Sequence, residues 1–235
     1  MALRALLFDI DGTLTKSGGA GARALATALG VKQRAAAELR NMRLDGMTDR
    51  SIVRLLLAAE RGDPSVPIAL RTAAVTDAEI DATLVPYLEA LAIECGKQAY
   101  VPMPGVPALI SQLATRGDVL LGLCTGNLER GAELKLSSTG LWGPFKFGGY
   151  GSDAELRPDV VRIAWRRAQA LGATEGLVIG DTPRDVLAAH DAGLPCCGVA
   201  TGRWTVHDLA TNGADAVLES FADLEKTLSV LLAPR

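Results

Sequence analysis

The chain has 235 residues, of which 49% are hydrophobic, and a formal net charge of −3. A chain of this length buries a full core, and it can hold one domain or a domain with a sizeable insertion. The charge balance and the lack of a basic run in the sequence argue against nucleic acid or an anionic membrane as a partner. We therefore expect small-molecule chemistry, carried out by a monomer or a homodimer.

The first ten residues and the cysteines indicate the compartment. Arg4 and Asp9 interrupt the stretch where a signal peptide needs an unbroken apolar segment, so we expect a cytoplasmic protein. The cysteines form no CxxC pair, and we expect buried, reduced thiols at Cys95, Cys124, Cys196 and Cys197. The three tryptophans are interpreted as packing residues. We expect the two histidines, His190 and His207, on helix surfaces or in loops.

The first predicted element is a short strand over residues 3–8, LRALLF, buried on both faces. It ends directly before two acids, Asp9 and Asp11. A turn-forming Asp-Gly pair is one explanation for acids at this place. A catalytic pair is the other, and the rest of the chain favours it.

The next part of the chain shows helical patterns and no convincing strand. Apolar positions at helical spacing over 51–60 predict one helix, and the capping-box pattern of Thr76 with Glu79 predicts the start of another. We predict an α-helical cap domain over residues 16–98, entered through the glycine-rich residues 17–21.

From about residue 100 onward, strand and helix patterns alternate. The proline-rich stretch 100–105 is interpreted as the linker that leads out of the cap. Alternation of this kind indicates a parallel sheet covered by helices on both faces. We predict an α/β fold with a Rossmann-like, doubly wound parallel sheet as the core domain, formed by residues 1–15 and 99–235. Its later strands are expected at 119–125, 176–181, 196–201 and 215–219.

Polar groups follow the predicted strands where each one ends. They occur in CTGN (124–127) and GDTPRD (180–185), and in the pair Arg157–Pro158 that opens a helix. Ligands of open α/β sheets bind outside the carboxyl ends of the strands. Carboxylates gathered there repel one another unless a cation lies between them, and hard oxygen ligands suit Mg²⁺. The sequence therefore predicts a magnesium site at this edge.

These motifs resemble those of the haloacid dehalogenase superfamily, on its phosphatase side. The chain is similar to phosphoglycolate-phosphatase-like and β-phosphoglucomutase-like members that carry a helical cap after the first motif. The resemblance covers nearly the whole chain and rests on four motifs in order: DIDGT at 9–13, Thr125 in CTGN, Arg157, and GDTPRD at 180–185.

The resemblance implies a Mg²⁺-dependent phosphatase that acts on a small phosphorylated metabolite. Asp9 would be the nucleophile that forms an aspartyl-phosphate, and Asp11 would act as general acid and then as general base. The metal ligands would come from Asp9, Asp181 and the backbone carbonyl of Asp11, with Asp185 supporting the metal shell. The phosphate would be held by residues of three motifs, namely Gly12, Thr13, Thr125, Gly126, Asn127 and Arg157.

Several of these residues have a structural explanation as well. Thr182 and Asp185 have the spacing of a helix cap, and Asn127 can cap the helix that follows it. Arg157 is the exception, because a positive charge at a helix start opposes the helix dipole. Something anionic must compensate for it, and the phosphate and the Asp9 carboxylate are the candidates.

The position and the contacts of the cap are also predicted. More than a hundred residues separate Asp9 from Thr125, so the cap is inserted after the first motif. Within it, LDGMTDRS (44–51) resembles the loop that faces the active site in relatives, which makes Gly46, Thr48 and Asp49 candidates for substrate specificity. Capping of the next helix by Thr48 or Asp49 is the alternative.

Other activities share part of this pattern. A phosphomutase of the β-phosphoglucomutase type has the same core motifs and differs in cap chemistry. Haloacid dehalogenation is disfavoured because those relatives lack an acid at the position of Asp11. A phosphonatase departs there too and needs a cap lysine, such as Lys16 or Lys32. A non-enzymatic phospho-acceptor signalling domain is far shorter and has no inserted cap.

Overall fold

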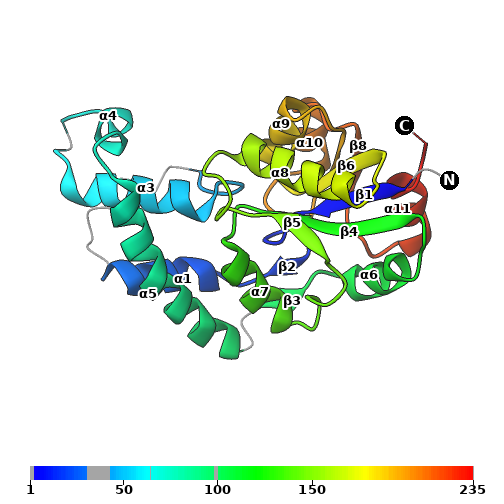
Figure 1. The fold of residues 1–235 in the computed structure, drawn as a ribbon, viewed down its shortest axis with the longest axis horizontal. Coiled ribbons are helices and arrows are strands. Elements are labelled where there is room, and N and C mark those ends of the chain that lie inside the picture. Colours follow the sequence, from blue (N-terminus) through cyan, green and yellow to red (C-terminus); the bar gives the residue numbers. More distant parts are fainter. Residues whose placement is uncertain (1–2, 31–42, 64, 98–99, 235) are drawn as a thin grey trace.

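The computed structural model describes residues 3–30, 43–63, 65–97 and 100–234. A six-stranded parallel sheet forms the core, in the order β5-β4-β1-β6-β7-β8 (Figure 1). The predicted doubly wound α/β fold is confirmed. The strands are β1 (Arg4–Phe8), β4 (Val119–Cys124), β5 (Phe147–Gly149), β6 (Glu175–Gly180), β7 (Cys196–Val199) and β8 (Ala216–Leu218).

Helices cover both faces of this sheet because the central strand is apolar on both sides. Leu6 and Phe8 of β1 lie in one core cluster, and Ala5 and Leu7 lie in the other. The first cluster is covered by α6 (Val106–Ala114), α7 (Glu129–Ser137) and α11 (Leu224–Leu231). The opposite face carries α8 (Arg157–Ala170), α9 (Pro183–Asp191) and α10 (Val206–Thr211).

The strand order places the carboxyl end of β1 at a topological switch point. From β1 the chain continues to β4 and β5 on one side, and then crosses to β6, β7 and β8 on the other. Connections leave β1 and its two neighbours in opposite directions, which opens a crevice at that end. Asp9 is the first residue after β1.

The helical part of the chain lies beside this edge of the sheet (Figure 1). The predicted helix at 51–60 and the Thr76–Glu79 capping box are both confirmed. The predicted cap boundaries, 16–98, stay a prediction. Residues 31–42, which include Lys32, and residues 64 and 98 of the predicted cap lie outside the described ranges. The described cap helices are α1 (Ala20–Leu29), α3 (Asp49–Arg61), α4 (Ile68–Thr72) and α5 (Asp77–Gly96).

Two short stretches of strand were not predicted. β2 (Thr15–Lys16) and β3 (Val101–Pro102) pair antiparallel at the entrance and exit of the helical part, with Lys16 opposite Val101. Two-residue strands have no periodicity to detect. β5 also escaped prediction, because its sequence, FGG, lacks an apolar run.

The remaining sequence expectations concern single residues. All four cysteines are buried, as expected, and His190 and His207 are exposed on α9 and α10. Trp142 and Trp165 pack against the core clusters as predicted, whereas Trp204 also donates from Nε1 to Asp45 Oδ2 at 2.8 Å. Among the described helices, none combines the length and the apolar character needed to cross a membrane.

Candidate active site

The turn after β1 brings the first motif against the end of β6. The Asp9 amide donates to the Ile179 carbonyl at 2.9 Å, which extends the pairing of the two strands by one residue. Gly12 then adopts a φ of 88°, and a Cβ atom there would lie 2.3 Å from Asp181 Oδ2. Only glycine fits this turn, since it alone tolerates both the left-handed backbone and the close carboxylate.

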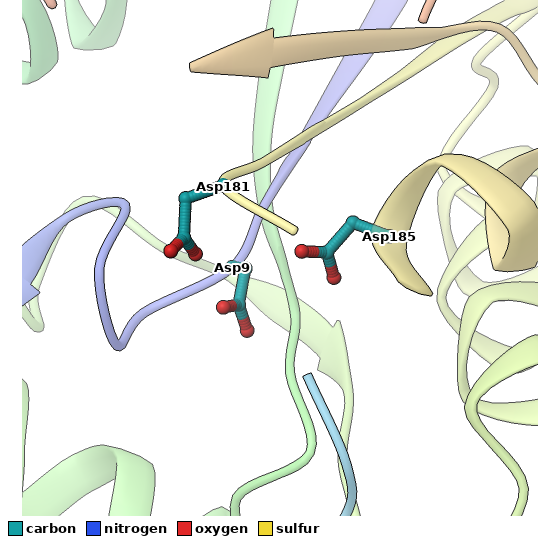
Figure 2. Close-up of side chains that lie close together, drawn as sticks. All are labelled: Asp9, Asp181 and Asp185. Atoms are coloured by element: carbon teal, nitrogen blue, oxygen red, sulfur yellow. The ribbon is translucent and has the colours of Figure 1, made fainter. Parts of the chain in front are cut away.

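Three carboxylates converge at this point. Asp9 follows β1, Asp181 follows β6 and Asp185 lies in the first turn of α9 (Figure 2). All three residues are buried, and one oxygen of each lies within 4.8 Å of the others. Burial raises the pKa of Asp9 to about 6 and, together with Asp185 and Asp9, raises the pKa of Asp181 well above its ordinary value.

This cluster has the properties of a divalent-metal site. Raised pKa values mean that the protein alone stabilises these negative charges poorly, so a cation between them would relieve the cost. The donors are all hard carboxylate oxygens, which suit a divalent cation such as Mg²⁺. The Asp11 side chain lies outside the cluster, and the use of its backbone carbonyl as a ligand stays a prediction.

Asp185 belongs to a helix cap at the same time. The Thr182 hydroxyl accepts from the Asp185 amide, and the Asp185 carboxylate accepts from the Thr182 amide at 3.1 Å, which forms a capping box for α9. Thr13 is similarly engaged, because its hydroxyl donates to Asp181 Oδ1 at 3.2 Å. Both structural contacts therefore fix carboxylates of the cluster.

Arg157 supplies the fixed positive charge. Its Nη2 donates to Asp9 Oδ1 at 2.9 Å, to Asp185 Oδ1 at 2.6 Å and to the Cys124 carbonyl at 3.0 Å. Of the two expected anionic partners, the Asp9 carboxylate is in contact with Arg157 and is joined by Asp185, and the contact with phosphate stays a prediction. Burial opposes the charge, but the two carboxylates outweigh it and raise the pKa of Arg157. Its buried Nε has no hydrogen-bond partner in the described structure.

The second motif, CTGN at 124–127, contacts Asp11 through Asn127. Asn127 Nδ2 donates to Thr125 Oγ1 at 2.7 Å and to Asp11 Oδ2 at 2.8 Å. The alternative that Asn127 caps the next helix is wrong, because α7 begins after Leu128 and has no side-chain cap. The Asn127 side chain instead donates to Thr125 and Asp11.

Lys135 is a member of the site that the sequence analysis missed. It lies on α7, is 3% exposed, and donates to Asp11 Oδ2 at 2.6 Å and to Asn127 Oδ1. A signal was present in the sequence. Lys135 lies four residues after Gly131 and next to Leu136, on the face of the helix that is buried. A lysine on such a face needs a partner, and here the partner is Asp11.

The cap loop closes over these residues. The Asp49 amide donates to the Gly126 carbonyl at 2.8 Å, and Asp49 Oδ2 accepts from the Leu128 amide at 3.0 Å. A Cβ atom on Gly126 would lie 2.2 Å from the Met47 carbonyl oxygen, and one on Gly46 would lie 2.5 Å from Thr182 Oγ1. Glycine at these two positions leaves room for the cap loop to lie directly against the core.

Thr48 and Asp49, two neighbouring candidates for substrate specificity in the cap, have different surroundings. Thr48 caps α3 by accepting from the Ser51 amide, and its hydroxyl lies 2.7 Å from the Glu155 carbonyl. Asp49 faces the cavity instead. The capping explanation therefore holds for Thr48, and the specificity roles of Gly46, Thr48 and Asp49 stay predictions.

Core and cap enclose a cavity of about 400 Å³. Of the predicted site residues, Gly12, Thr13, Asp185 and Thr48 are not part of its lining. The apolar part of the lining comes mainly from the cap, including Leu25, Leu44, Met47 and Ile52. The predicted residues that line the cavity are Asp9, Asp11, Gly46, Asp49, Thr125, Gly126, Asn127, Arg157 and Asp181.

The burial of Asp49 under the closed cap predicts that the free energy of unfolding depends on pH. Burial raises the pKa of Asp49 from 3.8 to about 6, against the opposing effects of Lys135, the Leu128 amide and the Tyr87 hydroxyl. The folded protein therefore binds this proton more tightly than the unfolded chain does. The resulting stabilisation is complete below the unfolded pKa and is lost as the pH rises through the folded pKa.

The measurement is metal-free denaturant unfolding of wild type and Asp49→Asn. Relative to the variant, the wild type should lose on the order of 3 kcal/mol of unfolding free energy between about pH 4 and pH 7. Parallel curves for the two proteins would mean that Asp49 is hydrated and that the cap stands open in solution.

Comparison with known proteins identifies the family. The family model described as haloacid dehalogenase-like hydrolase matches residues 3–193. The chain belongs to this family. Phosphoglycolate phosphatase from Yersinia pseudotuberculosis is 30% identical to this hydrolase over 227 residues, which cover 95% of the chain and 92% of that protein.

Solved structures agree with this hydrolase in fold. A hydrolase from Pseudomonas syringae has a TM-score of 0.71 at 24% identity, and the match covers 97% of this chain and 99% of that one. CbbY from Rhodobacter sphaeroides, solved in complex with phosphate, has a TM-score of 0.68 at 24% identity and covers 95% and 96%. Both matches extend over the sheet and the cap helices together.

Proposed function

We propose that this haloacid dehalogenase-like phosphatase hydrolyses a small phosphorylated metabolite of the phosphoglycolate class, with Mg²⁺ and an aspartyl-phosphate intermediate. The convergence of Asp9, Asp181 and Asp185 with Arg157 at the switch point of the sheet carries the proposal. The sequence relative named as a phosphoglycolate phosphatase spans nearly the whole chain and supports the substrate class.

In the first half of the reaction Asp9 is the nucleophile. An oxygen of its carboxylate attacks phosphorus, and the bond from phosphorus to the ester oxygen breaks. The leaving oxygen takes a proton from Asp11, which lines the cavity. Arg157 holds the Asp9 carboxylate in place through its Nη2, so the attack starts from one orientation.

In the second half a water molecule cleaves the aspartyl-phosphate. Asp11 takes a proton from this water as it attacks phosphorus, and the bond from phosphorus to the Asp9 oxygen breaks. Free phosphate and the original carboxylate of Asp9 are the products. Asp11 is thereby protonated again for the next turnover.

Thr125 is the proposed donor to the phosphoryl group. Its Oγ1 accepts from the Asn127 side chain at 2.7 Å and from the Asn127 amide at 3.3 Å. Because both contacts use the oxygen as an acceptor, its own hydrogen remains available for a phosphate oxygen. Gly126 and Arg157 also line the cavity beside it.

The implied metal fits the residues present. Asp9, Asp181 and Asp185, with the backbone carbonyl of Asp11, would hold Mg²⁺, which supplies charge neutralisation for the phosphoryl group when bound. We propose a cytoplasmic location, as expected for a chain whose four cysteines are all buried inside the fold. We propose that the protein acts as a monomer or a homodimer.

A phosphate-release screen tests this function. We expect the purified protein to release free phosphate from short phosphorylated acids or sugars over many turnovers with Mg²⁺, and to lose this activity in excess chelator. Restoring Mg²⁺ should restore it. Unchanged turnover in chelator would contradict the metal assignment, and transfer of the phosphoryl group to a second position of the substrate would identify a phosphomutase instead.

A further inference from the structure

Lys135 lies where a lysine is unfavourable for stability alone. Its side chain is 4% exposed, and taking an ammonium group out of water costs several kcal/mol that one ion pair does not always return. A lysine in the last turn of a helix interacts favourably with the helix dipole, but an exposed lysine there would have the same favourable interaction. The buried position therefore needs another explanation, and the contacts of Lys135 provide it.

The first contact fixes one oxygen of Asp11. Lys135 Nζ at 2.6 Å and Asn127 Nδ2 at 2.8 Å both donate to Oδ2. Within the described structure no hydrogen bond is formed to the other oxygen, Oδ1. The side chain of Asp11 is 43% exposed, so without these donors its rotamer would be free. With them, one oxygen is anchored and the other remains for proton transfer.

The second contact fixes Asn127. Lys135 has only donors, so the amide oxygen of Asn127 must face it, and the amide nitrogen must face the other way. That nitrogen donates to Asp11 and Thr125. One ammonium group thus sets the orientation of two site residues directly, and that of Thr125 through Asn127.

The surroundings of Lys135 keep it in this place. Its Nζ lies 5.4 Å from the centre of the Tyr100 ring, within the range of a cation–π contact. Gly131, one turn earlier on α7, lies against Leu88 and Leu91 of the cap. The lysine is therefore held between core and cap when the cap is closed.

We propose that Lys135 is a positioning residue of this phosphatase, which holds Asp11 and Asn127 so that Asp11 Oδ1 faces the leaving oxygen of the substrate. This inference rests on the proposed function, in which Asp11 is the general acid. It predicts that the benefit of Lys135 depends on how much the leaving group needs a proton. An alkoxide needs one, whereas 4-nitrophenolate leaves without it.

The test compares kcat/KM of Lys135→Met on three substrates, because this constant reports the step in which the ester bond breaks. Methionine has a similar length and no charge, and Asp11 is exposed enough to be hydrated. We expect a loss of about 10- to 100-fold on phosphoglycolate and equally on glycerol phosphate, and little loss on 4-nitrophenyl phosphate. Lys226→Met, on the exposed side of α11, is the matched control.

A double-mutant comparison isolates the role of Asp11. In the Asp11→Asn background, Lys135→Met should have almost no further effect on phosphoglycolate, because the group it positions is already lost. A full additional loss in that background would overturn the proposal. So would an equal loss on all three substrates, or a rise in KM confined to phosphoglycolate, which would assign Lys135 to the carboxylate of the substrate.

A structural readout separates this proposal from the proposed function. Crystal structures of wild type and Lys135→Met should show the Asp11 carboxylate in one orientation in the first and displaced in the second. An unmoved Asp11 in the variant would overturn the positioning role. Failure of the wild type to release phosphate from any ester would instead contradict the proposed function, and the crystal structures would still test the positioning of Asp11.

Discussion

Replacement of Asp9 by asparagine is expected to abolish phosphate release and leave the fold intact. Asparagine has the same shape but cannot accept the phosphoryl group, so kcat should fall by at least about 10⁴-fold. Stability without metal should not fall, because burial, together with repulsion from the neighbouring carboxylates, raises the pKa of Asp9 and Asp181, so removing one negative charge relieves a cost. Arg157 keeps its contact with Asp185.

Single-turnover phosphate release and the melting temperature together check this prediction. Asp118→Asn is a matched control, because Asp118 is a partly exposed aspartate paired with Arg116 at the other end of the sheet. If Asp9→Asn turned over as fast as this control, another residue would have to receive the phosphoryl group. A variant that is inactive because it is unfolded is recognised by its melting temperature.

Substitution of Gly126 by alanine is expected to separate the cap from the core. The new Cβ atom would lie 2.2 Å from the Met47 carbonyl oxygen and 2.9 Å from the Thr48 Cα atom. Backbone cannot yield as a flexible side chain does, so the cap loop must move away from the site. Alanine retains the backbone amide at this position. A displacement of about 1 Å in an active site costs about 10²-fold in rate, and we expect a loss of at least that size in kcat/KM.

Activity and limited proteolysis of the cap measure the effect. Gly117→Ala is the control, because a Cβ atom on Gly117 meets nothing within 4 Å. The variant at Gly126 should lose activity and expose the cap to protease, while Gly117→Ala should do neither. Wild-type activity in Gly126→Ala would mean that the close contact with Met47 is not required for turnover.

The parts of the fold that were predicted from sequence have strong local patterns. The runs that became β1, β4 and β6 are mostly apolar and followed by polar motifs, so they indicated buried parallel strands and the edge where their ends meet. The carboxylate cluster followed from topology alone, because Asp9 and Asp181 each come directly after such a strand.

What was missed depends on contacts between distant residues. Lys135 and Asp11 are 124 positions apart in the chain, and no local pattern links them. The same is true of Trp204, which reaches the cap at Asp45. Asn127 was left open between two roles because its spacing suits both. In the structure its side chain donates to Asp11, an acceptor that only the tertiary fold brings near it.

The short ribbon of β2 and β3 has a consequence for how the enzyme can change. Lys16 and Val101 are direct neighbours across this ribbon, so the chain leaves the sheet and returns to it at one place. The length of the intervening segment can vary with little effect on either end, since the entropy of closing a loop grows only with the logarithm of its length. Lids of different size and shape can thus be exchanged above one unchanged carboxylate cluster, and new substrates become accessible without rebuilding the core.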